Sequence, residues 1–213
     1  MPAPPVLQLA PLHFAHPGDA PLFNGLALTL GPGLHALQGD AGSGKTTLLR
    51  LLGGDLAGAL AASGPACLNG VPVDPTSAAW RAAVCHADLR GDGCDDQTPA
   101  ERMAALRQRH PALDVAAWQR HIDGFGLAPH AAKTLFMLST GMRRKATLAA
   151  MLASGATLLL LDEPLAGLDA PSTAWLMQAL TERAAQPGCA TLMVSGRWPP
   201  GLAQAGQVLL PPG

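Results

Sequence analysis

The chain has 213 residues, of which 48% are hydrophobic, and its formal net charge is −1 at pH 7. This length suits one domain, and the apolar content excludes an intrinsically disordered chain. The balanced charge gives no general electrostatic reason to expect nucleic acid as a partner.

The first part of the chain predicts short strands followed by a helix. Apolar residues at strand spacing predict strands over Val6–Leu9 and Leu26–Leu30. A short apolar run over Leu34–Gln38 predicts a further strand, and the leucine stripe of Gly44–Leu52 predicts a helix. The Gly, Pro and Asn residues of 63–75 predict turns and small strands.

The middle of the chain predicts helices, and its last part alternates strands with helices. Thr98–Gln108 and Asp114–Phe125 each begin at a residue that caps helices well. The remaining predicted elements are a helix over Gly141–Ala153, a buried parallel strand over Thr157–Leu161, a helix over Leu176–Ala185 and a buried strand over Ala190–Ser195. This order predicts an α/β core with a helical insertion between about residues 87 and 150.

Residues 39–46, GDAGSGKT, match the phosphate-binding pattern GxxxxGK[ST] in full. Its glycines let backbone N–H groups turn inward around an anion, and the following helix adds its positive end. Lys45 would reach the β- and γ-phosphates, and the Thr46 hydroxyl would bind Mg²⁺. A plain glycine-rich turn is the alternative, which the position between a predicted strand and helix disfavours. The candidate nucleotide-binding residues are Gly39, Asp40, Ala41, Gly42, Ser43, Gly44, Lys45, Thr46 and Thr47.

Two acidic residues end the apolar strand in TLLLLDEPLAGLD, residues 157–169. Open α/β sheets bind ligands at the carboxyl ends of their strands. We therefore expect Asp162 to hold Mg²⁺ together with Thr46, directly or through water, and Glu163 to act as general base on the attacking water. The alternative is a solvated strand end with two surface acids, which the phosphate loop upstream disfavours.

The segment LSTGMRRK, residues 138–145, predicts a helix start that carries unfavourable charges. Ser139 or Thr140 is a natural N-cap. Arg143, Arg144 and Lys145 then crowd the first turn, where cations oppose the helix dipole. Such a helix start would bind an anion favourably. Judged from this segment alone, however, a solvated basic face is the favoured interpretation.

Taken together, GDAGSGKT, LSTGM, LLLLDEP and AGLD (166–169) resemble, in order and spacing, the motifs of ATP-binding cassette (ABC) ATPases. The chain is most similar to bacterial single cassettes, including the haem-exporter type. This resemblance implies an α/β fold with a P-loop NTPase-type core and mixed sheet, an inserted helical subdomain and an N-terminal antiparallel β region. It also implies one nucleotide-binding domain over 1–213, with its core at about 1–86 and 146–213 and a helical lobe at about 87–145.

The resemblance further implies roles for individual residues. In the family two cassettes sandwich two ATP molecules, so Ser139 and the Gly141 amide would complete the partner cassette's site. Lys45 and Glu163 would be the catalytic residues. Asp169 would match the aspartate that couples the two sites. His16 lies where an aromatic residue usually stacks on adenine, although a surface-loop histidine is an equal alternative.

Two family residues are missing from the expected positions. A glutamine usually ends the strand before the helical lobe, but AAVCHADL (82–89) offers His86, or alternatively Ala87. A switch histidine usually follows the last core strand, where this chain has Gly196 with Arg197 beside it. Losing such a phosphate contact commonly costs a few kcal/mol, about 10²–10³ in rate, by analogy with lost oxyanion donors. We therefore expect slow hydrolysis, unless His86, Arg197 or a different partner cassette compensates.

The expected function is that of an ATP-binding, ATP-hydrolysing subunit of an ABC transporter. ATP and Mg²⁺ would be its cofactors, and a membrane permease and a second cassette, identical or different, its partners. No nucleic acid is expected as a partner. The alternatives are an ATP-dependent clamp with little turnover of its own and a soluble ABC ATPase outside transport. The transported substrate would be set by the permease and any binding protein, and this chain does not indicate the direction of transport.

The expected location is the cytoplasm, on the cytoplasmic face of the inner membrane as a peripheral subunit. No apolar run reaches the ~18 residues that a membrane span needs. The N-terminal stretch MPAPPVLQLAPLHF lacks the basic start and long apolar run of a signal peptide. Any action at a membrane would therefore require a separate membrane partner.

Overall fold

The computed structural model of the chain describes residues 4–56, 59, 64, 66–87, 89 and 96–211. Part of the predicted turn region 63–75 and the first part of the predicted helical lobe lie outside these residues. Within the described part of the chain, no helix is both long and apolar enough to cross a bilayer.

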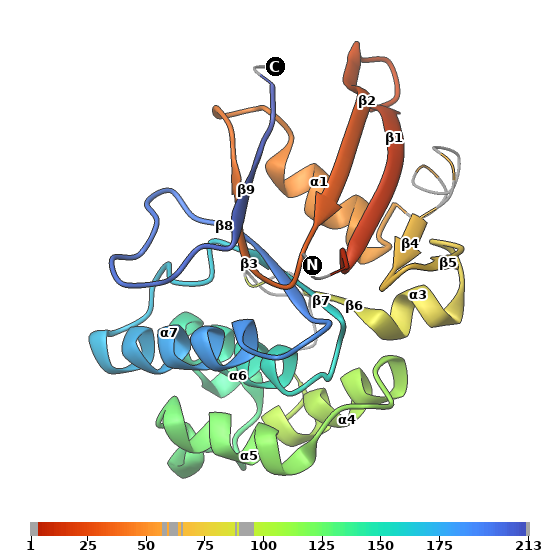
Figure 1. Cartoon of the computed structure of the whole chain (residues 1–213). Coiled ribbons are helices and arrows are strands. Elements are labelled where there is room, and N and C mark those ends of the chain that lie inside the picture. Colours follow the sequence, from red (N-terminus) through yellow and green to blue (C-terminus); the bar gives the residue numbers. More distant parts are fainter. Residues whose placement is uncertain are drawn as a thin grey trace.

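A parallel sheet forms the centre of the molecule (Figure 1). Its strands β7 and β8 are apolar and buried on both faces, as expected for parallel strands covered by helices. The predicted strands over Thr157–Leu161 and Ala190–Ser195 are therefore confirmed, and β9 was missed. In spatial order the strands are β6 (Val84–His86), β7 (Leu158–Asp162), β8 (Ala190–Val194), β3 (Gly33–Gln38) and β9 (Gly206–Leu209).

A second, antiparallel sheet comes from the N-terminal part of the chain. The predicted strands Val6–Leu9 and Leu26–Leu30 were too short, because they belong to one long hairpin whose pairing runs from Leu7 opposite Leu30 to Ala15 opposite Pro21. The antiparallel β region expected at the N-terminus is thus confirmed, whereas the core sheet, expected to be mixed, has only parallel pairings among the described residues. In spatial order the strands are β2 (Pro21–Leu30), β1 (Leu7–Ala15), β4 (Ala66–Leu68) and β5 (Val71–Val73).

Helices α3, α4, α5, α6 and α7 each begin at a residue whose side chain caps them, whereas α1 begins at Gly44 without a side-chain cap. Thr98 and Glu101 form a reciprocal capping box at the start of α4, and Asp114 caps α5, as predicted. Helix α7 starts earlier than predicted because Asp169 caps it and Pro171 fits its first turn. The helices are α1 (Lys45–Gly53), α3 (Ala78–Ala83), α4 (Pro99–Arg109), α5 (Val115–Gly124), α6 (Thr140–Leu152) and α7 (Ala170–Ala184), with short 3₁₀ turns η1 (Ala128–His130) and η2 (Leu135–Met137).

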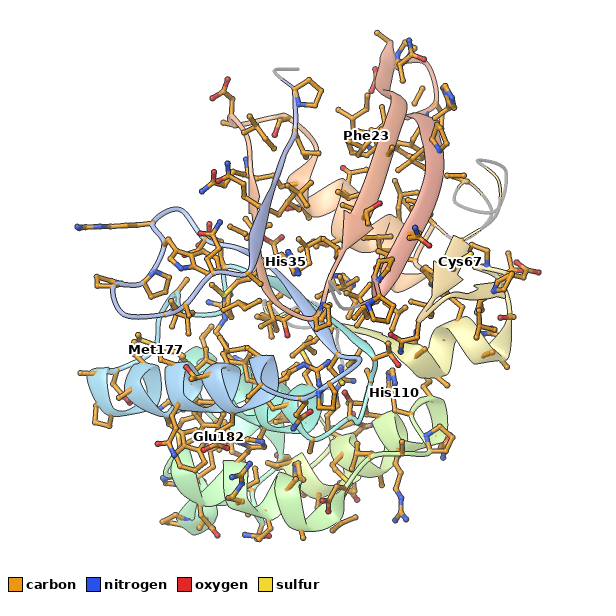
Figure 2. All side chains as sticks on the ribbon, viewed as in Figure 1. Phe23, His35, Cys67, His110, Met177 and Glu182 are labelled. Carbon is orange, nitrogen blue, oxygen red and sulfur yellow. The ribbon has the colours of Figure 1, made fainter. Side chains whose placement is uncertain are left out.

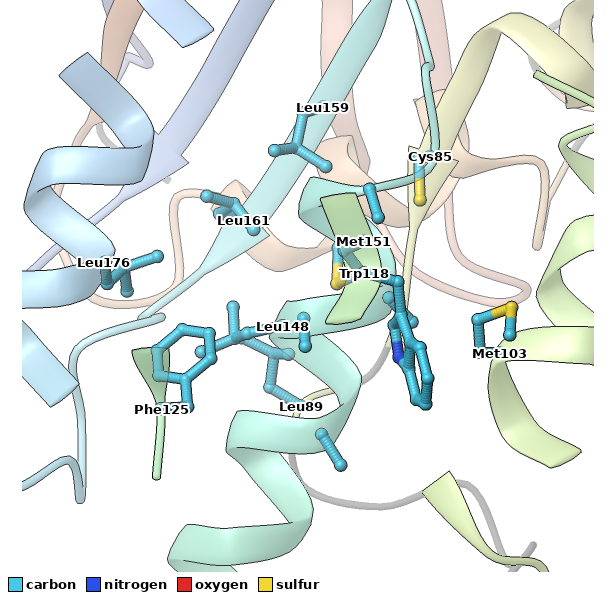
Figure 3. Packing of buried hydrophobic residues seen from close by; sticks show 14 of the residues in the cluster. Cys85, Leu89, Met103, Trp118, Phe125, Leu148, Met151, Leu159, Leu161 and Leu176 are labelled. Atoms are coloured by element: carbon cyan, nitrogen blue, oxygen red, sulfur yellow. The ribbon is translucent and has the colours of Figure 1, made fainter. Parts of the chain in front are cut away.

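Alternate residues of β7 face two separate apolar clusters. Leu158 and Leu160 pack with the side of α1 and the antiparallel sheet, where Figure 2 labels Phe23. Leu159 and Leu161 pack on the opposite side with α5, α6 and α7, as the close view of Figure 3 shows. Because both faces of the sheet are covered, ligands can reach it only at the carboxyl ends of its strands.

Candidate functional site

The phosphate-loop motif forms the turn between β3 and α1. Gly42 and Gly44 have φ angles of 84° and 91°, in the left-handed region that favours glycine. A Cβ at Gly39 would lie 2.5 Å from the Ser43 hydroxyl oxygen, so only glycine leaves room there. No acidic residue stands in the first turn of α1. The first turn of the helix therefore carries no acidic side chain of its own, and its N-terminal N–H groups suit an anion.

The Lys45 side chain folds back over this loop. Its ammonium group donates hydrogen bonds to the carbonyl oxygens of Gly39, at 2.8 Å, and Asp40, at 2.7 Å. The Ser43 hydroxyl beneath is buried, with no hydrogen-bond partner in the described part of the chain. A phosphate oxygen would supply partners for both groups, so the loop fits a nucleotide phosphate.

Thr46 and Asp162 meet directly. The Thr46 hydroxyl donates a hydrogen bond of 2.7 Å to Oδ2 of Asp162, joining the first turn of α1 to the end of β7. A hydroxyl and a carboxylate beside a phosphate site are the oxygen ligands that Mg²⁺ uses in nucleotide sites. The donor set therefore fits the predicted metal.

Glu163 adopts an unusual backbone conformation, with φ at 47°. A left-handed residue other than glycine costs roughly 1–2 kcal/mol, and here the Glu163 N–H is held by the Val194 carbonyl at 3.0 Å. A Cβ at Gly196 would lie 3.7 Å from Oε1 of Glu163, which is ordinary contact distance. Position 196 therefore lies beside the Glu163 carboxylate, with room for a side chain.

The basic start of α6 is explained by contacts with the loop 166–169. Ser139 caps the helix by accepting a hydrogen bond from the Met142 N–H at 3.2 Å. Arg144 donates to the Ala166 carbonyl at 2.5 Å, and the Lys145 ammonium donates to Oδ2 of Asp169 at 2.6 Å. The interpretation as a solvated basic face is therefore wrong for Arg144 and Lys145.

Gly141 is also close to this loop, since a Cβ there would lie 3.2 Å from the Gly167 carbonyl oxygen. The Lys145 side chain is only 12% exposed. Hydrogen bonds from Lys145 and Ser172 hold the pKa of the Asp169 carboxyl well below its usual range. The signature-like segment and the loop 166–169 are thus joined by backbone contact and by charge.

His16 lies at the exposed end of the β1–β2 hairpin, linked to the phosphate loop by two rings. Its imidazole meets Phe14 edge-on with ring centroids 4.9 Å apart, and Phe14 lies 6.4 Å from Phe23. Phe23 in turn packs against the loop, because its Cζ would be 2.9 Å from a Cβ at Gly44. His16 is therefore connected to the phosphate loop through the rings of Phe14 and Phe23.

His86 and Ala87 both line a cavity of about 350 Å³ that also contains Thr46 and Asp162. Nδ1 of His86 lies 3.7 Å from Oδ2 of Asp55, a neighbour that sequence reasoning missed and that no motif signals. Arg197 is exposed and is not among the described residues that line this cavity. Of the two substitutes considered, His86 is thus the one beside the predicted metal site.

We predict that Lys145→Met raises the pKa of Asp169, because it removes the main hydrogen bond to the carboxylate. A carboxyl group with a depressed folded-state pKa contributes stability at pH values above the ordinary Asp pKa of about 3.9. That contribution is lost as the pH falls through the depressed pKa. The stability deficit of Lys145→Met should therefore be present at pH 7 and shrink below about pH 4.

Urea unfolding across this pH range measures the effect, with Lys133→Met at an exposed lysine as control. If Lys145→Met lost the same unfolding free energy at every pH, the ion pair with Asp169 would not be the cause of the loss.

Comparison with known proteins agrees with this geometry. The family described as ABC transporter matches residues 23–166. The cytochrome c biogenesis ATP-binding export protein CcmA of Nitrosospira multiformis is 33% identical over 181 residues, covering 84% of this chain and 85% of the relative. The nickel import ATP-binding protein NikO of Rhodobacter capsulatus is 35% identical over 178 residues, covering 79% and 70%.

Among solved structures, a putative ABC transporter ATP-binding protein from Pyrococcus furiosus superposes with a TM-score of 0.71 at 18% identity, covering 96% of each chain. This likeness supports the fold, while the sequence matches cover the phosphate loop, the signature-like segment and the acidic strand end. The chain therefore belongs to the ABC transporter family, as the ATP-binding subunit of a transporter.

Proposed function

We propose that the chain hydrolyses ATP with Mg²⁺ and so drives a separate membrane permease. The observation that carries this proposal is the hydrogen bond of 2.7 Å between Thr46 and Asp162, with Glu163 following on the same strand end. These groups lie beside the phosphate loop and so combine anion binding, metal ligation and a base in one place.

In the proposed reaction Lys45 exchanges its loop carbonyls for phosphate oxygens and so positions the nucleotide. Residues 39–47 surround the phosphates with N–H groups and hydroxyls, and His16 stacks on the base. Mg²⁺ held by Thr46 and Asp162 would neutralise charge that develops on the phosphates. Glu163 accepts a proton from the attacking water.

A second cassette completes the site in this proposal. Ser139 and Gly141 lie at the N-terminus of α6, held to the loop 166–169. The positive end of that helix would face the γ-phosphate bound to the partner cassette. The partner is either a second copy of this chain or a different cassette whose own site is complete.

We further propose that residues 1–213 form one nucleotide-binding domain, with its core at about 1–86 and 146–213. The lobe at about 87–145 would meet the permease and hold the chain at the cytoplasmic face of the inner membrane. Phe136 and Met137, in η2, are 77% and 65% exposed. Adjacent large apolar side chains at such exposure support a protein contact there.

CcmA, at 33% identity, is named as an export protein, whereas NikO, at 35% identity, is named as a nickel import protein. Because the matches span opposite directions of transport, what they share with this chain is the ATP-driven step. The cargo would be selected by the permease.

Glu163→Gln should lower ATP turnover by about 10²–10⁴ while leaving ATP binding intact, because the amide cannot accept the proton of the attacking water. Turnover and equilibrium nucleotide binding are measured on the purified chain. Glu182→Gln, in the last turn of α7 and paired with Arg120, is the matched control. Unchanged basal turnover in Glu163→Gln would mean that this chain is a clamp whose own site does not hydrolyse.

Gly196→His should raise turnover by at least about 10-fold, and by as much as ~10²–10³, by analogy with the donors of oxyanion holes. The side chain has room there and its Cβ would lie 3.7 Å from Glu163, next to the attacking water. Gly196→Ala adds the Cβ without the imidazole and should leave the rate low. If Gly196→His bound ATP normally but turned over no faster than the wild type, the missing side chain at position 196 would not be the cause of slow hydrolysis.

Purification of the tagged full chain from gently solubilised membranes, with and without ATP, tests the coupling. We expect a polytopic membrane protein in the eluate. A different cassette in the same eluate would account for the tolerated Gly196. Only soluble partners, or none, would contradict the transport role.

A further inference from the structure

A small cavity of about 80 Å³ lies where α5, α6 and α7 meet, on the side of the parallel sheet that these helices cover (Figure 1). None of residues 39–47, Asp162 or Glu163 is among the described residues that line it. A single water needs roughly 10–15 Å³ of such space, so the cavity has room for a small ion together with water. We name it the interhelix cavity.

Arg183 of α7 lines the interhelix cavity and is a buried cation, only 6% exposed. In the described part of the chain it has no carboxylate as an ion-pair partner. Its Nε donates to the Thr191 hydroxyl at 3.1 Å, and its Nη2 donates to the Ala156 carbonyl at 2.6 Å and, over longer distances, to two further carbonyls. Its Nη1 donates to no described residue. Because a guanidinium group has only donors and a buried charge is costly without compensation, Nη1 requires an acceptor.

His121 of α5 brings a second unsatisfied nitrogen to the same cavity. It is 3% exposed, and its Nδ1 is buried without a hydrogen-bond partner among the described residues. The ring of Trp175 packs edge-on against the imidazole, with ring centroids 5.9 Å apart. Burial lowers the pKa of His121 to about 4, so the ring is neutral at pH 7. A neutral imidazole that carries its proton on Nδ1 can donate one hydrogen bond there.

The carboxylate that lines the interhelix cavity already has partners. Oε2 of Glu182 accepts a hydrogen bond of 2.9 Å from Nη1 of Arg120, and Oε1 accepts one of 2.9 Å from Gln178. Figure 2 labels Glu182 between α7 and α5. The charges of Arg120 and Glu182 cancel, so the described lining keeps one net positive charge, which is that of the buried Arg183.

We propose that the interhelix cavity binds a small inorganic anion of the size of chloride, held by Nη1 of Arg183 and Nδ1 of His121. Both nitrogens lack an acceptor in the described part of the chain, and both belong to side chains that are more than nine-tenths buried. A water molecule could accept both hydrogen bonds, but an anion also compensates the charge of Arg183. This site does not depend on the proposed ATP hydrolysis.

An anion in this position would join two helices. His121 belongs to α5, within the proposed helical lobe, and Arg183 belongs to α7, which begins after Asp169. The ion pair between Arg120 and Glu182 also joins these helices, but both side chains are partly exposed, so it contributes little. Anion binding is therefore expected to stabilise the contact between α5 and α7.

The test compares thermal unfolding of the full chain in sodium chloride and in sodium gluconate at equal ionic strength. Gluconate is too large for the interhelix cavity, and equal ionic strength removes differences in general screening. A ligand that binds only the folded chain raises the unfolding temperature, by about 2–4 °C when chloride is at about five times its dissociation constant. Crystals soaked in bromide should show anomalous density between Arg183 and His121.

Two variants remove the proposed donors. His121→Phe keeps a ring against Trp175 but removes Nδ1, and Arg183→Gln removes Nη1, so each should lose most of the increase in chloride. His130→Phe is the matched control and should keep the increase. Nδ1 of His130 is likewise buried without a partner among the described residues, but His130 is not part of the described lining. If Arg183→Gln does not fold because the Ala156 carbonyl loses its donor, His121→Phe decides the test.

Three results would overturn the proposal. The first is an equal unfolding temperature in the two salts. The second is an increase in chloride that persists in folded His121→Phe or that is lost equally in His130→Phe. The third is bromide found at the protein surface as an adventitious ion only.

Discussion

The hydrogen bond between Thr46 and Asp162 joins two parts of the chain that are 116 residues apart. It forms because β3, which leads into the phosphate loop, and β7, which ends at Asp162, are parallel members of one sheet, separated only by β8. Parallel strands present their carboxyl ends at the same edge, so loop, hydroxyl and carboxylate arrive together. Every role proposed for the site depends on this shared edge.

Glu163 and Gly196 lie next to each other at the same edge of the sheet. Asp162 is paired in register with Val194, and the Glu163 N–H bonds the Val194 carbonyl, so the segments leaving β7 and β8 are adjacent. This adjacency makes the absence of a side chain at Gly196 chemically significant. The backbone there is open and accepts a Cβ, so the structure itself does not require glycine at that position.

Sequence reasoning succeeded where a local pattern has one structural solution. The apolar run of β7, the capping box at Thr98 and the GDAGSGKT loop all lie where the sequence predicted them. It underestimated the β1–β2 hairpin, because register shifts along β1 between Leu9 and Ala15 interrupt the alternation that marks a half-exposed antiparallel strand. It missed β9, whose alternating burial over four residues gives little local signal.

Side-chain partnerships across the fold were beyond local reasoning. Nothing near Lys145 indicates that its partner is Asp169, which is 24 residues later in the chain. The signal was indirect, since cations in the first turn of a helix are unfavourable unless something compensates them. Asp55 gave no signal of its contact with His86, because these two residues come together only when the end of α1 packs beside β6.

Helix α6 connects the segment proposed to face the second cassette with a cavity beside the end of β6. Its first turn holds Gly141 against the loop 166–169, and a later face, with Met151, lines a cavity of about 330 Å³ that His86 also lines. From Ser139 to Met151 the helix spans roughly 18 Å, at ~1.5 Å per residue. Because buried packing along α6 makes it a rigid element, a shift imposed on its Met151 end would also move the helix start. The helix start proposed to face the second cassette is thus mechanically coupled to the packing around Met151.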